Sequence, residues 1–341
     1  MNTITVLTML KNRVVESNKM IDDDIKKGAE LIREGKLVTF PTETVYGLGA
    51  DATNDRAVVN IYSAKGRPTF NPLIIHVTSL EEAKRYGEFN AVAEKLACRF
   101  WPGPMTLVVK RIPNCGISYM VTAGLDTIAI RVPSNETALR FLKECGTPVA
   151  APSANASGKV SSTTAEHVRE SLGTRAGFII ESGKSDIGLE STIILATRDV
   201  PVILRPGYIT KEDIEKVIGK VEKYNPEKIA SSKEGNKPMA PGQLKSHYAP
   251  RIPLIMNATH FPSDYAILAF GKVSGDIHPD LNLSEKGDLV EAAGNLFDYM
   301  RRLDTFPYKG IAVTPVPDEG IGVAINDRLR RASQNGFPDK K

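Results

Sequence analysis

The sequence is poor in cysteine, with three among 341 residues. Cys98, Cys115 and Cys145 lie far apart and form no C-x-x-C pair, which excludes a disulfide framework and a cysteine zinc site. We interpret them as reduced thiols and expect a cytoplasmic protein. No apolar run reaches the length of a membrane span, and Met1–Lys11 lacks the basic start and apolar core of a signal peptide, so we expect no membrane association.

Motifs of two hydrolase classes are absent as well. The sequence contains no G-x-S-x-G nucleophile elbow, and its five histidines show no H-E-x-x-H spacing, which argues against a serine hydrolase of that type and against a zinc hydrolase. The formal net charge of +4 permits an anionic ligand. A dedicated nucleic-acid binder usually carries a denser basic patch.

Two glycine patterns resemble nucleotide-binding motifs but differ from them in spacing. Gly47–Ala52 fits G-x-G-x-x-A, yet Pro41–Tyr46 separates it from the strand expected at Leu37–Phe40. A dinucleotide site needs the first glycine directly after the strand. Gly177–Ser185 resembles a P-loop, but five residues separate its glycines where that motif has four, and its apolar residues favour a strand followed by a turn. We therefore expect neither standard loop.

Short apolar runs alternate with helical patterns, which is typical of an α/β protein, and the length predicts two domains. We expect strands at Leu37–Phe40, Leu73–Val77, Thr106–Val109, Thr127–Val132, Phe178–Ile180, Thr192–Leu195 and Val202–Leu204, and around Val149. We expect helices from Ile21 to a stop at Gly35, from a cap at Asp55 to about Lys65, at Ala91–Trp101, Asn135–Cys145 and Thr164–Leu172, and at Ile209–Ile218 with Thr210 as the cap.

A polar stretch follows this block. Glu222–Gly242 contains three prolines and few large apolar residues, which predicts an extended interdomain linker. The apolar pattern resumes after Pro250, with strands expected at Leu254–Met256, Ala266–Phe270 and Ile311–Thr314 and helices at Leu289–Leu303 and near Val323–Arg331. This pattern predicts a second, smaller α/β domain of about ninety residues.

Polar and basic residues gather at the ends of the strands in the first domain, where α/β sheets bind ligands. Lys65, Arg67, Arg131 and Arg205 are the cations of these segments, and Ser153, Asn155 and Ser157 add neutral donors. Cations and bidentate arginines suit a triphosphate in the absence of a P-loop. Each segment taken alone also fits an ordinary surface turn, so the sequence leaves both interpretations open.

Five ordered segments together resemble the YrdC-type threonylcarbamoyl-AMP synthases across roughly Ile21–Ile218. They are Pro41–Gly49, Lys65–Arg67 with Asn71–Leu73, Pro152–Gly158, Ser191–Ile193 and Arg205–Gly207. The remainder resembles the longer form of that family, in which a linker joins the synthase domain to a small Rossmann-like domain. Pro241–Pro250 is similar to the linker motif of that form, with Ala240 where the family often has serine.

The resemblance implies an α/β protein with a YrdC-like twisted open mixed sheet with flanking helices, plus a smaller Rossmann-like α/β C-terminal domain. On this basis we place the synthase domain at residues 15–218, the linker at 219–249 and the small domain at 250–341. The implied reaction joins L-threonine, bicarbonate or CO2, and ATP into threonylcarbamoyl-AMP and pyrophosphate. The product then serves threonylcarbamoyl modification of the adenosine 3′ of the anticodon in tRNA.

Site residues are carried over from the resemblance. Lys65 and Arg67 are expected to be catalytic. ATP is expected at Lys65, Arg67, Asn71, Thr127, Ser153, Asn155, Ser161, Arg205 and Tyr248, and threonine at Thr44, His76, Arg131, Ala151 and Ser191. Mg2+ is expected to arrive with ATP, and no carboxylate cluster indicates metal ligands. The expected recipient of the product is the tRNA threonylcarbamoyl transferase machinery, and a tRNA or RNA contact is left open.

Three other functions remain as alternatives at this stage. An RNA-binding module of the same fold without synthase activity agrees with the sign of the net charge. A carbamoyl-transfer enzyme of the same fold belongs to larger chains with additional modules in related families. A dehydrogenase conflicts with the spacing at Gly47. A threonine requirement separates the synthase from all three.

Overall fold

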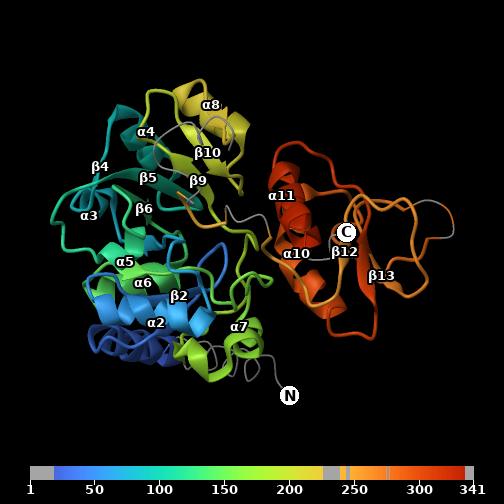
Figure 1. Ribbon diagram of the computed structural model, residues 1–341, viewed down its shortest axis with the longest axis horizontal. Coiled ribbons are helices and arrows are strands. Elements are labelled where there is room, and N and C mark those ends of the chain that lie inside the picture. The colour runs from blue at the N-terminus through green and yellow to red at the C-terminus, as the bar shows by residue number, and fades with distance from the viewer. Residues whose placement is uncertain (1–18, 226–238, 243–245, 274, 276, 335–341) are drawn as a thin grey trace, which may run out of the picture.

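The computed structural model describes residues 19–225, 239–242, 246–273, 275 and 277–334. Two bodies are visible in Figure 1, a larger one formed by the chain up to α8 and a smaller one that carries the C-terminal helices. The α/β class predicted from the sequence is confirmed. Outside the described residues lie Pro226 and Pro238 of the predicted linker and the N-terminal segment Met1–Lys11.

A mixed sheet of eleven strands forms the larger body within the described part of the chain. Its order is β11-β10-β9-β5-β6-β3-β7-β2-β1-β8, with β4 beside β5. The strands are β1 (Val38–Phe40), β2 (Gly47–Asp51), β3 (Ile74–His76), β4 (Gly87–Glu88), β5 (Met105–Arg111), β6 (Thr127–Arg131), β7 (Val149–Ala150), β8 (Phe178–Ile179), β9 (Thr192–Leu195), β10 (Val202–Arg205) and β11 (Glu222–Lys223). Parallel pairs such as β3–β6 occur beside antiparallel pairs such as β5–β6.

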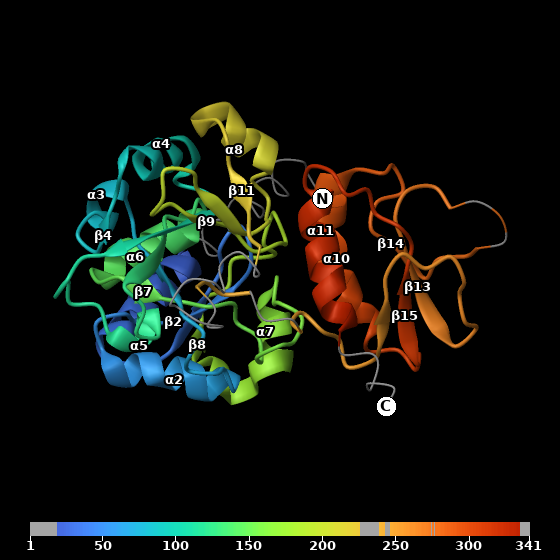
Figure 2. The same cartoon turned by 45° about the horizontal axis from the view of Figure 1, so that its top comes forward.

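Helices flank this sheet (Figure 2). They are residues 19–33, α2 (Asp55–Lys65), α3 (Leu80–Ala83), α4 (Ala91–Phe100), α5 (Tyr119–Thr122), α6 (Glu136–Cys145), α7 (Ala165–Leu172) and α8 (Lys211–Ile218). Thr210 caps α8 as predicted. The predicted cap Asp55 is wrong, because the side chain of Asn54 accepts from the amides of Arg56 and Ala57 and Asp55 is the first helical residue. An extended backbone at Asn54 allows this capping geometry.

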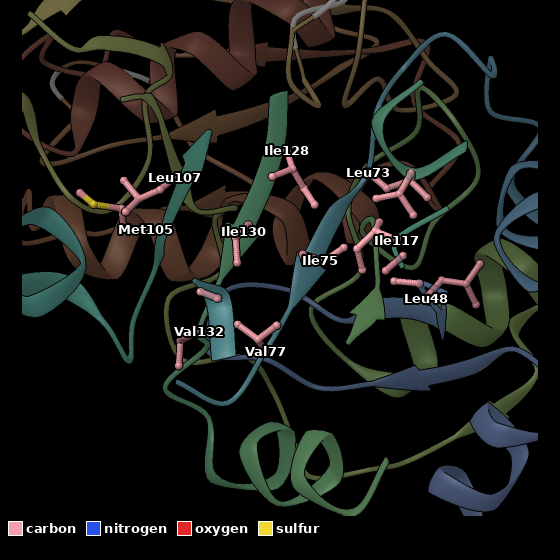
Figure 3. Close-up of a cluster of buried hydrophobic side chains, with 14 of the residues drawn as sticks. Leu48, Leu73, Ile75, Val77, Met105, Leu107, Ile117, Ile128, Ile130 and Val132 are labelled. Atoms are coloured by element: carbon pink, nitrogen blue, oxygen red, sulfur yellow. The ribbon is translucent and has the colours of Figure 1, made fainter. Parts of the chain in front are cut away.

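Alternation along the central strands sends their side chains to two different faces of the sheet. Successive side chains of a strand point to opposite faces. Ile128 and Ile130 of β6 and Ile75 of β3 therefore enter the main hydrophobic core, as Figure 3 shows. Arg131 and His76 are the next residues along the same two strands and belong to the opposite face. The same strands thus supply the main core on one face, and a second apolar cluster with polar side chains at its edge on the other.

The residues of the glycine pattern at Gly47 form the strand β2 and not a nucleotide-binding loop. β2 pairs antiparallel with β1, and no helix follows its glycines directly. A Cβ at Gly49 would lie 2.9 Å from Cγ1 of Val149, so this glycine permits the close approach of β7. The P-loop-like segment contains a strand, β8, as predicted, but residues 180–185 are irregular and form no turn. Neither segment has the geometry of a standard nucleotide motif.

A parallel sheet of four strands forms the smaller body, in the order β12-β15-β13-β14. Its elements are β12 (Leu254–Ile255), β13 (Tyr265–Ala269), β14 (Leu281–Asn282), α10 (Leu289–Leu303), β15 (Gly310–Val313) and α11 (Gly322–Ser333). Both helices lie between this sheet and the larger body in Figure 1. Parallel strands joined by helices agree with the Rossmann-like domain implied by the resemblance.

An apolar cluster joins the two bodies. Val45 and Leu189 of the larger body are buried in one cluster with Phe297 of α10. Gly188, at φ +72°, brings its backbone against α10, where a Cβ would lie 2.8 Å from Cα of Gly294. A side chain at Gly188 would therefore strain the backbone and separate the two bodies. This packing places α10 and α11 beside the strand ends of the larger sheet.

No helix in the described ranges combines the length and apolar character that crossing a membrane requires. The cytoplasmic location inferred from the cysteines stays a prediction.

Candidate active site

A pocket lies at the edge of the larger sheet where β3, β6 and β10 end. These three strands run in the same direction, so their carboxyl ends meet at one edge. The cavity holds about 50 Å³. Nine of the predicted site residues line it: Thr44, Arg67, His76, Arg131, Ala151, Ser153, Ser191, Arg205 and Tyr248. A larger cavity of about 290 Å³ between α8 and α11 contains none of the predicted residues.

Arg131 occupies one wall of the pocket and is fixed by the loop that follows β1. Its Nη1 donates to Oγ1 of Thr44 over 2.8 Å, and its Nη2 lies 2.7 Å from Oε1 of Glu43. Nε donates to the carbonyl oxygen of Gly103 over 3.3 Å. Both members of the Arg131–Glu43 pair are buried. The wall therefore presents an oriented guanidinium, a group that binds carboxylates in bidentate geometry.

His76 faces the same part of the pocket as a neutral imidazole. Burial, and secondly the charge of Arg131, lower the pKa of His76 to about 3. Its Nδ1 has no hydrogen-bond partner among the described residues. Phe40 packs edge-on against the ring, with the ring centres 5.9 Å apart. A neutral imidazole held in this way suits a hydrogen bond with a hydroxyl group.

Lys65 lies behind the pocket wall. As the last residue of α2, it donates from Nζ to the carbonyl oxygen of Ser153 over 2.5 Å and to that of Asn155. Burial, and secondly the charge of Arg67, lower the pKa of the Lys65 amine well below its ordinary value. Lys65 therefore ties the end of α2 to the loop that presents Ser153 to the pocket.

Arg67 and Arg205 provide two cations on the other side of the pocket. Arg67 donates to the carbonyl oxygens of Asn71 and Pro72 over 3.2 and 2.8 Å. Burial lowers the pKa of Arg67 to about 10, which leaves it charged at neutral pH. Burial also lowers the pKa of Arg205, whose Nε and Nη2 both donate to the carbonyl oxygen of Ser191. Two buried cations side by side favour an anionic ligand.

The remaining predicted residues lie outside the pocket wall. The Asn71 side chain is buried without a hydrogen-bond partner in the described part of the chain, whereas the backbone carbonyl oxygen of Asn71 accepts from Arg67. Asn155 braces its loop by donating to the carbonyl oxygens of Ala156 and Lys159. Ser161 donates to Glu190. Thr127 lies at the opposite end of β6 from Arg131, on the same face of the sheet.

Four described residues of the connection between the two bodies contribute to the pocket. Pro241, Gly242, His247 and Tyr248 line it, and the carbonyl oxygen of Pro241 lies 3.5 Å from Nη1 of Arg205. His247 contacts Tyr248 with ring centres 4.1 Å apart. Tyr248 in turn stacks on Phe297 of α10 at 5.6 Å. These residues therefore connect the pocket directly with the smaller body. Residues 243–245 of the predicted linker motif lie outside the described residues.

Comparisons with known proteins cover both bodies. Residues 30–207 match the family model described as Telomere recombination, and residues 209–334 match that of the threonylcarbamoyl-AMP synthase C-terminal domain. The threonylcarbamoyl-AMP synthase of Bacillus subtilis strain 168 is 41% identical over 328 residues, which cover 92% of this chain and 93% of that protein. That of Pyrococcus abyssi is 41% identical over 344 residues, which cover 97% and 98%. The chain belongs to the threonylcarbamoyl-AMP synthase family.

A solved structure of this family agrees with the fold. The crystal structure of P. abyssi Sua5 complexed with L-threonine superposes with a TM-score of 0.81 at 40% identity, covering 91% of this chain and 94% of that one. The two-domain synthase predicted from the sequence is confirmed, and threonylcarbamoyl-AMP synthesis is its activity. The RNA-binding module without activity, the carbamoyl-transfer enzyme and the dehydrogenase are not supported.

Two acidic residues were not predicted from the sequence, one in the pocket wall and one that pairs with an arginine of that wall. Glu43 lies inside the conspicuous Thr-Glu-Thr segment and pairs with Arg131. Glu190 directly precedes the Ser191 segment, lines the pocket and pairs with Arg328. Both carboxylates directly precede predicted substrate residues in the sequence, and this position could have identified them as site residues. Their partners lie far away in sequence, so no local pattern indicates the pairing.

Proposed function

We propose that the pocket binds ATP and L-threonine on two different groups of side chains. Arg67 and Arg205 face the triphosphate, and Arg131 pairs with the carboxylate of threonine. The ATP group comprises Lys65, Arg67, Asn71, Thr127, Ser153, Asn155, Ser161, Arg205 and Tyr248, and the threonine group comprises Thr44, His76, Arg131, Ala151 and Ser191. The supporting observation is the convergence of three buried arginines on one pocket at the carboxyl ends of parallel strands.

The reaction then needs little from the protein beyond positioning and charge. The threonine amine combines with bicarbonate, with loss of water, or with CO2, with loss of a proton, to form a carbamate. A carbamate oxygen attacks the α-phosphorus of ATP, the bond to the bridging oxygen of pyrophosphate breaks, and threonylcarbamoyl-AMP and pyrophosphate result. The attacking carbamate is already an anion, so this step requires no histidine base. Arg67 and Arg205 stabilise the charge that develops on the leaving pyrophosphate.

Threonine selectivity follows from the neutral state of His76. Its depressed pKa keeps the imidazole uncharged at neutral pH, so the imidazole does not repel the ammonium group of the substrate. Its unpartnered Nδ1 offers a hydrogen bond to the threonine hydroxyl. A substrate without the hydroxyl would leave a buried polar atom unsatisfied, which disfavours its binding.

Magnesium enters as part of the ATP substrate and not as a resident metal. Glu190 of the pocket wall is engaged with Ser161 and Arg328, and Glu43, which does not line the pocket, is engaged with Arg131. No group of three potential metal ligands occurs among the described residues. These side chains do not fit a protein-held Mg2+ cage, and Mg2+ commonly binds through substrate phosphates. We assign no step to a protein-bound metal.

Pro241, Gly242, His247 and Tyr248 act as a lid over this site. The cavity of about 50 Å³ is far below the roughly 300–1,000 Å³ of a typical ligand pocket, so the lid must move to admit ATP. His247 and Tyr248 are its inner contacts. After closure, the lid excludes water from an adenylate that hydrolysis would destroy.

The product passes to the tRNA threonylcarbamoyl transferase machinery, with the cytoplasm as the proposed location. Nothing further in the described part of the chain indicates an RNA contact, which stays a secondary proposal. The product transfer and the RNA contact depend on the synthase reaction and are tested after it.

Pyrophosphate release by the purified protein is the test. ATP and Mg2+ are present throughout, and threonine and bicarbonate are each added or withheld. Release that requires both supports the proposed chemistry, and trapping of threonylcarbamoyl-AMP completes the assignment. Release that ignores threonine would refute the proposed threonine site. Arg131→Gln provides the internal comparison, because it should raise the KM for threonine and leave that for ATP nearly unchanged.

A further inference from the structure

Arg328 of α11 lies inside the interface between the two bodies, and its side chain is 0% exposed. Its Nε donates to Oε2 of Glu190 over 2.9 Å, and its Nη1 donates to the carbonyl oxygen of Pro206 over 2.8 Å. The guanidinium also lies over the ring of Tyr248, 5.1 Å from its centre. This one side chain of the smaller body therefore contacts three segments that border the active-site pocket.

Glu190, the acceptor, is itself part of the pocket wall. Its second carboxylate oxygen accepts from Ser161. Burial opposes ionisation of this carboxyl, but the charges of Arg328 and Arg205 outweigh it and hold the pKa of Glu190 below its ordinary value. A buried anion beside a triphosphate site repels the phosphates and attracts the cations that should bind them, unless another cation neutralises it.

The two nearby arginines divide this task between them. Arg328 forms the direct ion pair with Glu190. The hydrogen bonds of Arg205 go to Ser191 and Pro241, and within the described residues none goes to Glu190. Asp327 accepts from Nη1 of Arg328 over 3.0 Å and orients it from the same helix. Arg205 is therefore left with its charge directed to the pocket.

We propose that Arg328 is a positioning residue of the synthase reaction, which neutralises Glu190 so that Arg205 stays available to the triphosphate of ATP. This inference rests on the proposed ATP site. It gives the smaller body a defined electrostatic contribution to an active site that the larger body otherwise builds. Loss of the Arg328 cation leaves Glu190 to pair with Arg205, whose charge already acts on it.

A charge-paired set of variants tests this inference by steady-state kinetics with each substrate varied. In R328Q, Glu190 is uncompensated, so the KM for ATP should rise by about tenfold or more, while the KM for threonine changes much less. In the double variant E190Q/R328Q both charges are removed, and the KM for ATP should return to within about threefold of the wild-type value. R328K retains the cation and should resemble the wild type more closely than R328Q does.

Controls separate this role from a purely structural one. R330Q changes an exposed arginine of the same helix and should leave the KM for ATP unchanged. If R328Q alone does not fold, the double variant decides, since removal of the unpaired buried charge should restore folding together with ATP affinity. A folded double variant whose KM for ATP remains tenfold raised would overturn the inference. The threonine dependence of pyrophosphate release in the wild type tests the proposed function separately.

Discussion

Arg205 donates to the carbonyl oxygen of Ser191 from both Nε and Nη2, over 3.2 and 2.9 Å. The same Nη2 lies 3.2 Å from the Ser191 hydroxyl, which also forms a 2.7 Å hydrogen bond with Oγ1 of Thr106. A residue assigned to threonine thus orients a cation assigned to ATP. On the proposed assignment, the boundary between the two substrates lies at Ser191.

Replacement of Ser191 by alanine separates these two roles. The backbone contacts to Arg205 remain, so ATP binding should be largely retained, whereas the hydroxyl available to threonine is lost. We expect S191A to raise the KM for threonine by about tenfold and the KM for ATP by much less, as for loss of one buried hydrogen bond. Initial rates with each substrate varied provide the measurement. A larger effect on ATP would move Ser191 to the nucleotide group.

Arg67→Ala removes a cation that is held only by the two carbonyl oxygens of Asn71 and Pro72 among the described residues. We expect kcat/KM for ATP to fall about a hundredfold, the size of effect typical for loss of one group that stabilises transition-state charge. Arg56→Ala, at an exposed arginine of α2, is the matched control and should retain wild-type activity. Near-normal turnover in R67A would contradict the phosphate role.

His76 couples the stability of the fold to pH. Its pKa is about 3 in the folded chain against an ordinary value of 6.5, so below pH 6.5 the unfolded chain binds a proton that the folded chain excludes. The contribution of His76 to the free energy of unfolding is complete above pH 6.5 and is lost as the pH falls towards 3. At pH 5 this loss is about 2 kcal/mol. Between pH 7.5 and 5.0, wild type should therefore lose about 2 kcal/mol more unfolding free energy than H76Q.

Urea unfolding at the two pH values measures this difference. H260Q changes an exposed histidine and should retain the wild-type loss of stability. Equal losses in wild type and H76Q would show that His76 takes up its proton in the folded protein.

Gly242 tests the fit of the lid. It has φ +86°, and a Cβ there would lie 2.8 Å from Cδ of Arg205. G242A should therefore prevent closure over the pocket and raise the KM for ATP, in addition to a backbone cost of about 1 kcal/mol. Gly219 has a similar φ of +77°, and a Cβ there would meet nothing within 4 Å, so G219A bears only the backbone cost. Equal kinetics for the two variants would argue against lid contact at Arg205.

Elements with a strong local pattern were predicted well from the sequence. The helix α10 and the strand β9 have the bounds expected from their apolar spacing. β2 was missed because Gly47 and Gly49 hide its alternation, and glycine is tolerated there only because β7 packs closely against the strand. The cap at Asn54 was assigned one residue too late, because two adjacent residues both have capping side chains.

The pocket was predictable to the extent that its residues are contiguous in short segments at strand ends. The fold determines the rest. Glu190 and Arg328 are 138 positions apart and meet only because α11 packs against the larger body. Their pairing depends on long-range packing that no spacing in the sequence records. Lys65 likewise lies in a segment that the sequence singles out, but its contacts with Ser153 and Asn155 place it behind the wall.

The alternation along β6 links the accuracy of folding to catalysis. A slip of this strand by one residue would turn Arg131 into the apolar core and Ile130 towards the substrates. An unpaired guanidinium buried among aliphatic side chains is strongly unfavourable, so the misaligned sheet is less stable than the native one. The arginine assigned to threonine therefore also guards against misfolding, and substitutions at this position should lower the yield of native enzyme as well as its affinity for substrate.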